Sequence, residues 1–382
     1  MDAGRVRILL IEDDPDDVWV MRNLLADRWE GQYELVHVEL LSAALELCSA
    51  QQFDVVLLDL TLPDSRGLET FFAVSSHADE MPIVVLTGLK DESAAVKAVQ
   101  AGAQDYLVKG QMDDNLLVRS IRYAIERSRR DFAERAMRDT SEEFRAAGEI
   151  QQRLYPVEDP EPDGFQIAGA LFPAKATAGD YFDYIPMSED RLGVVVGDVS
   201  SHGMGPALLM SETRACLRTL AQTFDDVGEI LTRANRVLAA DTSDSHFVTL
   251  AMMRLDPADR TMIYASAGQR GHLFHVDGSV ATLDSTALPL GVRADTVVPA
   301  AAPRHLQPGE LVVFFTDGVV EAESPGRVRF GYRRALELIR SEQQRTPREI
   351  IDALHGELQS FCRNTPQLDD ITIVVVKARD SG

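Results

Sequence analysis

The sequence predicts an α/β domain and an α+β domain joined by a long helix, and three observations support this prediction. In residues 1–125, short apolar runs alternate with amphipathic stretches, which is typical of a parallel sheet covered by helices on both faces. In residues 157–382, groups of strand-like runs and helical patterns follow one another without strict alternation, which indicates an α+β layered fold. Residues 113–156 are rich in the helix formers Arg, Glu, Ala and Leu and contain a single glycine, Gly148.

Length, charge and cysteine content limit the classes of protein to consider. The 382 residues suit two to three domains. A net charge of −23 argues against a general nucleic-acid partner, because phosphates would be repelled. Cys48, Cys216 and Cys362 lie far apart, which disfavours a disulfide scaffold or a zinc ribbon. The first apolar run is too short for a signal peptide, and no run approaches the roughly 18 apolar residues that cross a membrane. We therefore expect a soluble, cytoplasmic protein with no membrane segment.

The elements of the first domain follow from its hydrophobic periodicity. Continuous apolar runs predict buried strands at 6–11, 54–59, 82–87 and 105–109. Amphipathic stretches predict helices at 16–28, 42–50 and 92–102.

Polar residues stand at the carboxyl ends of these strands. The first strand leads into Glu12 and Asp13, and the next three end at Asp59, Thr87 and Lys109. Because the carboxyl ends of parallel strands meet at one edge of a sheet, we expect these side chains to lie close together. Crowded carboxylates repel one another and call for a bound cation, and magnesium prefers oxygen ligands of this kind.

Four motifs in this segment, IEDDP, LLDLTLPDSRGLE, VLTG and DYLVKG, resemble those of response-regulator receiver domains. The resemblance implies a five-stranded, doubly wound parallel sheet of the flavodoxin-like kind. It also implies that Asp59 is the phosphoacceptor. Magnesium would be held by Asp13, Asp59 and the backbone carbonyl of Thr61, with Glu12 close by.

The same resemblance assigns roles to three more residues and implies a partner. Lys109 would bind the phosphoryl oxygens, Thr87 would move to hydrogen-bond the phosphoryl group, and Tyr106 would be the coupled aromatic residue. The phosphodonor would be a sensor histidine kinase or a phosphotransfer protein. Gly110 departs from the family pattern, which usually has a proline after the lysine.

The connecting segment, residues 113–156, overlaps the last helix of the first domain. Its apolar residues form one helical stripe at Val118, Ile121, Ile125, Phe132 and Ala136. This stripe is consistent with a coiled-coil homodimer. The many arginines indicate either a solvated helix face or a surface that docks on an acidic surface of a neighbouring domain or a second subunit. The stripe breaks at residues 139–143, and helix propensity is low at Gly148, so we expect a hinge and a regulatory role there.

The third segment, residues 157–382, contains the elements of a layered fold. Strands are predicted at 165–171, 181–185, 192–196, 247–255, 261–266, 311–315 and 371–377. Helices are predicted at 204–222, 227–240, 332–341 and 347–361.

Four acidic motifs punctuate this segment and suggest a metal site. They are AGDYFD with Asp180, VVGDVSSHGMG with Asp198, FFTDGVVEA with Asp317, and LDDITIVVV with Asp369 followed by Asp370. Three of them adjoin apolar strands, so their carboxylates are expected where strands begin or end. Oxygen-only ligands select magnesium or manganese over zinc, and a pair of such ions can activate a water and bind a phosphoryl oxygen.

The order of these motifs is similar to that of metal-dependent protein phosphatases of the 2C-like class, in particular the bacterial SpoIIE branch. EIQQRLYP, YASAG, LPLGV, LQPGELVVFFTDGVVEA and FGYRRA also fit that branch. The resemblance implies a layered αββα sandwich that binds two manganese or magnesium ions. Asp198 would bridge them with help from the Val199 carbonyl, and Asp180, Asp317 and Asp369 would complete the shells. The attacking group would be an activated water, so no phosphoenzyme is expected.

Three residues depart from the pattern of that branch. Ser201 stands where it often has glycine, Ala178 replaces a glycine before Asp180, and Gln269 replaces a common histidine. None of these changes removes an expected metal ligand. His202 is either a proton donor to the leaving oxygen or a structural residue of a glycine-rich turn.

Together, these features predict a two-component response regulator whose output is a metal-dependent serine/threonine phosphatase controlled by phosphorylation of Asp59. The resemblance implies a phosphoserine or phosphothreonine substrate on a regulatory protein such as an anti-sigma-factor antagonist. The alternative is a signalling scaffold with a weak or inactive phosphatase domain. A DNA-binding output would need a helix-turn-helix and a basic surface after residue 130, and the sequence contains neither.

Overall fold

The protein is described from a computed structural model covering residues 5–29, 32–78, 80–88, 92–201, 203–241, 246–363 and 365–379. The chain forms two compact units, Met1–Thr140 and Ser141–Gly382. The boundary between the units falls inside one long helix, α5 (Asp114–Gln152).

The first unit is built on a parallel sheet with the strand order β2-β1-β3-β6-β7. Its strands are β1 (Val6–Ile11), β2 (Tyr33–Val38), β3 (Val55–Asp59), β6 (Ile83–Thr87) and β7 (Asp105–Val108), and a small hairpin of β4 (Thr61–Leu62) and β5 (Ser65–Arg66) follows β3. This order confirms the flavodoxin-like prediction. Strand β2 was not among the strands expected from apolar runs, because it is a half-buried edge strand in which polar and apolar residues are mixed.

Helices cover both faces of this sheet. They are α1 (Pro15–Trp29), α2 (Leu41–Ala50), α3 (Leu68–Ser75), α4 (Glu92–Gln100) and the first part of α5. Strand residues alternate between the faces, so Leu9 and Leu58 pack towards α2, α3 and α4, whereas Ile8 and Leu57 pack towards α1 and α5. The short helix α3 was not predicted from periodicity.

Helix α5 contains 39 residues and continues without interruption through residues 139–143, so the predicted polar break does not end the helix. At its start, the Asp113 carboxylate accepts a hydrogen bond from the Leu116 backbone N–H at 2.7 Å. Leu117 and Ile121 are fully buried against the receiver-like sheet. Further along the helix, the side chain of Met137 is 75 % exposed, so the apolar stripe leaves the core of the first unit.

The second unit is a sandwich of two antiparallel sheets. One sheet has the order β15 (Arg304–His305), β12 (Thr261–Ala267), β11 (Val248–Asp256), β10 (Leu192–Val199) and β9 (Tyr181–Pro186). The other has the order β14 (Val280–Leu283), β13 (Gly271–Phe274), β16 (Leu311–Phe315), β17 (Ile371–Ala378) and β8 (Phe165–Phe172). The short strands β13, β14 and β15 were not predicted.

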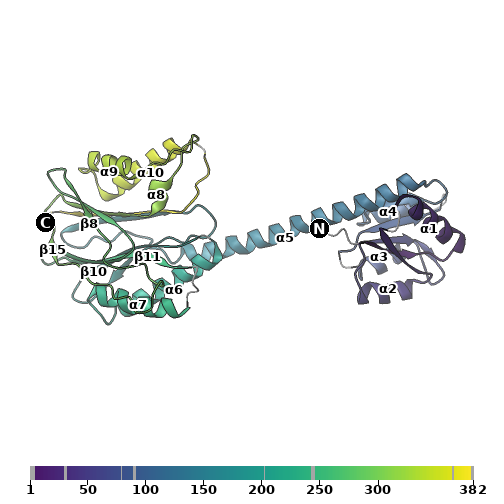
Figure 1. Cartoon of the computed structure of the whole chain (residues 1–382), viewed down its shortest axis with the longest axis horizontal. Coiled ribbons are helices and arrows are strands. Elements are labelled where there is room, and N and C mark those ends of the chain that lie inside the picture. Colours follow the sequence, from purple (N-terminus) through teal and green to yellow (C-terminus); the bar gives the residue numbers. More distant parts are fainter. Residues whose placement is uncertain are drawn as a thin grey trace. The chain divides into compact units, whose positions relative to one another are not determined.

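Helices form the outer layers of the sandwich (Figure 1). They are α6 (Met204–Leu220), α7 (Val227–Asp241), α8 (Asp317–Glu321), α9 (Tyr332–Ser341) and α10 (Pro347–Cys362). One core lies between the two sheets and contains Phe182 and Phe314. A second core joins the first sheet to α6 and α7, and a third joins the other sheet to α9 and α10. The αββα prediction is therefore confirmed.

Among the described residues, no helix is long and apolar enough to span a membrane.

Candidate functional site

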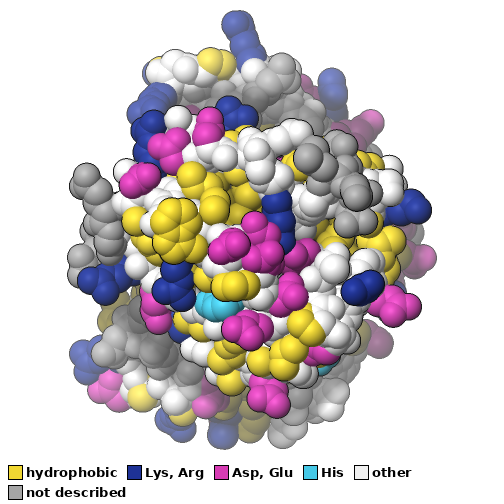
Figure 2. Space-filling model, turned by 90° about the vertical axis from the view of Figure 1, so that its right-hand side faces the viewer, with side chains coloured by type: hydrophobic (Ala, Val, Ile, Leu, Met, Phe, Trp, Pro, Cys, Tyr) yellow, Lys and Arg dark blue, Asp and Glu magenta, His cyan; other side chains and the backbone are white. Residues whose placement is uncertain are grey.

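The first acidic cluster lies at the carboxyl edge of the parallel sheet. Oxygens of Glu12, Asp13 and Asp59 all lie within 4.8 Å of one another. Lys109, which follows β7, places its Nζ 2.6 Å from a Glu12 oxygen and 2.9 Å from Asp17, and it also pairs with Asp59. Asp17, in the first turn of α1, was not among the predicted site residues. On the face drawn in Figure 2, acidic side chains gather near the middle, with hydrophobic side chains beside them.

Burial and charge set the protonation of this cluster. Glu12 is fully buried, and burial, assisted by the Asp59 charge, raises the pKa of Glu12 to about 7, although Lys109 opposes the shift. Burial alone would lower the pKa of Lys109, but its hydrogen bonds to Asp59, Glu12 and Asp17 raise that pKa well above its usual value. The lysine therefore stays charged, and the remaining negative charge suits one divalent cation.

The other residues predicted for this site lie around Asp59. The backbone N–H of Thr61 donates a hydrogen bond to Asp59 Oδ1 at 2.9 Å, which holds the Thr61 backbone beside the carboxylate. Thr87 is buried at the end of β6, and its hydroxyl donates to the Gly88 carbonyl at 3.2 Å. Tyr106 is half-buried on β7 and packs against the core under α2, α3 and α4.

The second acidic cluster lies at one edge of the sandwich and draws on both sheets. Asp180 directly precedes β9 and Asp198 lies near the end of β10, which pairs with β9. Asp317 begins α8 directly after β16, and Asp369 precedes β17, which pairs with β16. In the described residues no three of these carboxylates lie within 4.8 Å of one another as those around Asp59 do, but the side chains of Asp180 and Asp198 are within hydrogen-bonding distance.

Electrostatics distinguish this second cluster. Asp180 is buried, and its Oδ2 accepts hydrogen bonds from the hydroxyls of Thr316 at 2.7 Å and Thr372 at 2.6 Å. Burial raises the pKa of Asp180 to about 8, although the two threonines oppose the shift. Burial, together with the charges of Asp180, Asp317 and neighbouring acids, raises the pKa of Asp198 to about 9.

No lysine or arginine in the described parts of the chain forms an ion pair with Asp180, Asp198 or Asp317. Their negative charge must therefore be compensated by protons or by bound cations. An all-oxygen donor set of this kind fits magnesium or manganese.

Asp370 has a different role from Asp369. Its carboxylate accepts hydrogen bonds from the backbone N–H groups of Ala174 and Gly179, both at 2.8 Å. It thereby binds the loop that precedes Asp180. Gly318 lies so close to this segment that a Cβ there would come within 1.9 Å of the Asp370 carbonyl oxygen, so only glycine fits.

With this geometry in view, we compared the chain with known proteins. The family model for Stage II sporulation protein E (SpoIIE) matches residues 188–379, about half of the chain. The chain belongs to the SpoIIE family. The model for the response regulator receiver domain matches residues 8–122. The chain thus combines a receiver domain with a SpoIIE domain.

Two curated relatives resemble much of the chain. Protein IcfG of Synechocystis sp. is 25 % identical over 334 residues, which cover 78 % of this chain and 51 % of IcfG. Phosphoserine phosphatase RsbU of Bacillus subtilis is 26 % identical over 246 residues, covering 62 % of this chain and 70 % of RsbU. The chain therefore spans about half the length of the first of these relatives.

Solved structures support the fold of the SpoIIE domain. The RsbU and RsbW domains of Rv1364c from Mycobacterium tuberculosis superpose with a TM-score of 0.51 at 29 % identity, covering 60 % of this chain and 64 % of that one. The SiaA-PP2C domain of Pseudomonas aeruginosa gives a TM-score of 0.56 at 21 % identity, covering 64 % and 99 %. At 21 % identity, the similarity to the SiaA-PP2C domain shows the fold alone.

The end of helix α5 contacts the loop that leads to Asp180. Gln151 is buried, and its side-chain amide exchanges two hydrogen bonds with the Ala178 backbone, at 2.7 and 2.9 Å. The Tyr155 hydroxyl donates to the Asp180 carbonyl at 2.9 Å. A Cβ at Gly148 would come within 2.0 Å of the Ala176 carbonyl oxygen. Gly148 was predicted as a hinge from its low helix propensity, but it lies inside α5 and permits a close backbone contact.

A buried ionic network, which sequence reasoning missed, fastens α6 beside this loop. Asp183 is fully buried on β9 and accepts two hydrogen bonds from Arg218, both at 2.6 Å, and one from Tyr181 at 2.7 Å. Arg214 donates to the Leu154 carbonyl at 2.8 Å. An aspartate within the apolar strand YFDYI was the available signal, because a buried carboxylate requires a partner.

The departures from the SpoIIE pattern have local explanations. Gln269 is buried and donates to the Phe315 carbonyl at 2.8 Å, so it links the two sheets. Ser201 has a φ of 73°, in the left-handed region that favours the glycine expected from the SpoIIE pattern. His202 lies outside the described residues.

Proposed function

We propose that the chain is a response regulator whose output is a metal-dependent serine/threonine protein phosphatase. The observation that carries the proposal is the cluster around Asp180 and Asp198, where carboxylates with raised pKa values have no lysine or arginine partner among the described residues. Such a cluster is suited to divalent cations, and Asp198, Asp317 and Asp369 lie within the residues that the SpoIIE model matches. The receiver would occupy residues 1–125, the connecting helix 113–156 and the phosphatase 157–382.

The phosphatase cluster would hold two manganese or magnesium ions. Asp198 and the Val199 carbonyl would lie between them, and Asp180, Asp317 and Asp369 would complete the ligands. When bound, such ions supply an activated water and bind the phosphoryl oxygens.

The protein itself holds these ligands in position. The hydroxyls of Thr316 and Thr372 orient the Asp180 carboxylate, and Asp370 fixes the loop before it. Because water is the proposed nucleophile, no phosphoenzyme is expected.

The receiver would be phosphorylated on Asp59 by a sensor histidine kinase or a phosphotransfer protein. Asp13, Asp59 and the Thr61 carbonyl would hold magnesium, with Glu12 close by. Lys109 already contacts Asp59 and is therefore placed to bind a phosphoryl group there. Thr87 and Tyr106 would respond to phosphorylation, as in other receivers.

The proposed substrate is a phosphorylated regulatory protein resembling an anti-sigma-factor antagonist. Support comes from the likeness to RsbU, which is named a phosphoserine phosphatase. Control by the receiver would pass along α5, because this helix begins in the receiver core and its last turns contact the loop that holds Asp180.

We further propose a homodimer through α5. The exposed side chains of Phe132, Met137 and Ile150 are the apolar surface available for it. Solution mass by light scattering tests this part, and a monomer at micromolar concentration contradicts it.

Two measurements test the proposed function. Manganese should stimulate hydrolysis of p-nitrophenyl phosphate by the full chain, and a chelator should abolish that hydrolysis. A beryllofluoride mimic at Asp59 should change the rate, and Asp59→Asn should remove this response. Metal-independent or absent hydrolysis would favour the scaffold alternative, while equal rates with and without beryllofluoride would defeat control by the receiver.

A further inference from the structure

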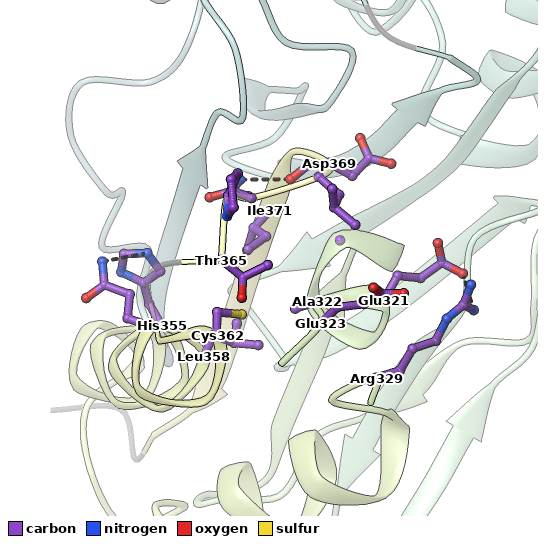
Figure 3. A pocket seen from close by; sticks show the side chains of 15 residues that line it. Glu321, Ala322, Glu323, Arg329, His355, Leu358, Cys362, Thr365, Asp369 and Ile371 are labelled. Carbon is purple, nitrogen blue, oxygen red and sulfur yellow. Dashed lines mark hydrogen bonds and ion pairs between the residues drawn. The ribbon is translucent and has the colours of Figure 1, made fainter. Parts of the chain in front are cut away.

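A cavity of about 460 Å³ opens beside the proposed phosphatase metal site (Figure 3). Helix α10 forms one wall through His355, Leu358 and Cys362, and Glu321, Glu323 and Arg329 form the facing wall. A loop before β17 completes the lining. No residue of this cavity other than Asp369 has a role in the proposed hydrolysis.

The cavity adjoins the site at two points. Asp369, a proposed metal ligand, lines it directly. Gly318, the residue after the proposed ligand Asp317, lines it as well. A protein substrate with its phosphorylated residue at the metal site would therefore bring a neighbouring side chain to the mouth of the cavity.

Apolar side chains form part of the cavity surface. Leu358 and Ile371 lie in the lining but are only 2 % and 4 % exposed, so the accessible apolar surface comes from the partly exposed Ala322 and Cys362 and from Leu368, which is 61 % exposed. The His355 ring, also part of the lining, stacks on Phe172 with 3.6 Å between ring centroids. This surface suits an aliphatic chain.

The charged wall carries one carboxylate in excess. Arg329 pairs with Glu321 at 2.7 Å, so these two charges offset each other. Glu323 lies opposite Arg329 on a short hairpin, joined to it by a backbone bridge. Among the described residues, no ion pair involves the Glu323 carboxylate, and this side chain is only partly exposed.

We propose that the cavity is a specificity pocket that receives a lysine or arginine side chain flanking the phosphorylated residue of the protein substrate. The inference rests on the proposed phosphatase function. Lysine and arginine combine an aliphatic stem with a terminal cation. The stem would lie against Ala322, Cys362 and Leu368, and the cation would meet Glu323.

The test uses the full chain with manganese and a set of phosphoserine peptides. The peptides differ at a single position, and each position flanking the phosphoserine is varied in turn. The residue at the varied position is lysine, norleucine, alanine or glutamate. The measured quantity is the ratio of kcat/KM values within one protein variant, so that a general loss of activity cancels. The variants are Glu323→Gln, Glu323→Lys and the control Glu357→Gln, which removes an exposed carboxylate of α10 outside this cavity.

At one flanking position, the wild-type protein should prefer lysine over glutamate by about fivefold, the effect of a partly exposed ion pair. Norleucine should exceed alanine there, because apolar side chains form part of the cavity surface. Glu323→Gln should bring the lysine-to-glutamate ratio close to one, Glu323→Lys should reverse it, and Glu357→Gln should leave it unchanged.

Equal hydrolysis of all peptides, or a lysine preference that survives Glu323→Lys, would overturn the pocket while leaving the phosphatase proposal standing. Failure to hydrolyse any phosphopeptide or p-nitrophenyl phosphate with manganese would overturn both proposals.

Discussion

The two acidic clusters of this chain neutralise their charge in different ways. In the receiver, Glu12, Asp17 and Asp59 surround Lys109, whose Nζ lies 2.6 Å from Glu12. In the SpoIIE domain, Asp180 and Asp198 have threonine and aspartate neighbours and no lysine or arginine partner among the described residues. One cluster carries its own cation, and the other takes up protons unless metal ions bind.

The difference suits two kinds of chemistry. In the receiver, Lys109 offsets part of the negative charge of the neighbouring carboxylates while Asp59 is modified. A single divalent cation then completes the charge balance. A cluster without a basic partner retains its full attraction for divalent cations, which is what metal-assisted hydrolysis needs.

The largest expected effect is that of Asp198→Ala. Removing the proposed bridging ligand should lower manganese-dependent hydrolysis of p-nitrophenyl phosphate by roughly 100-fold or more, because metal assistance contributes several kcal/mol. Thermal unfolding should not be impaired, since the substitution also relieves crowding of carboxylates. The control is Asp352→Ala, which removes an exposed acid of α10. Retained manganese-dependent hydrolysis in Asp198→Ala would contradict the assignment of this metal site.

Lys109→Met would remove the basic partner of the receiver cluster, so that this cluster would resemble the one around Asp180 and Asp198. It removes the cation from beside buried Glu12, so the free energy of unfolding should fall by about 3 kcal/mol at neutral pH without metal. Millimolar magnesium should restore part of the loss, because the uncompensated carboxylates then bind the ion more tightly. Urea unfolding with and without magnesium measures both effects. If magnesium left the free energy of unfolding of Lys109→Met unchanged, the lysine would not be the main group that neutralises these carboxylates.

Gly148→Ala should disturb only the phosphatase cluster. The new Cβ collides with the Ala176 carbonyl, in the loop before Asp180, and should cost about 1–3 kcal/mol of stability. Manganese affinity should fall, while magnesium binding to the receiver should stay unchanged. Gly356→Ala is the matched control, because a Cβ at this glycine of α10 meets nothing within 4 Å. Equal effects of the two substitutions on calorimetric manganese binding would exclude a special role for Gly148.

The smallest effect concerns protons. Without metal, burial and mutual repulsion raise the pKa values of Asp180 to about 8 and of Asp198 to about 9, so this pair of carboxyl groups holds at least one proton at pH 7. Manganese requires carboxylates, so its binding should release protons, and its apparent affinity should rise as the pH increases towards 9. Calorimetry in two buffers of different ionisation enthalpy detects the release, and Asp198→Ala should diminish it. A binding heat that does not depend on the buffer would contradict the protonated state.

Much of the fold and of both clusters could be predicted from local sequence. Continuous apolar runs predicted β1, β3, β6 and β7, because central parallel strands are buried on both faces. The edge strand β2 and the short strand β13 were not predicted, because a short or half-polar segment shows no clear hydrophobic periodicity. The acidic motifs were recognisable because most of them adjoin an apolar strand.

The sequence by itself determined which residue types stand at the strand ends, and therefore the proposed chemistry of Asp59 and Asp198. Only the tertiary structure decided which groups neutralise or orient them. Lys109 reaches Asp59 across 50 residues, and Thr372 reaches Asp180 across 192. The structure also decided that Gly148 permits a backbone contact, which low helix propensity alone could not indicate. Such contacts depend on how distant elements pack, and local propensity contains no information about that packing.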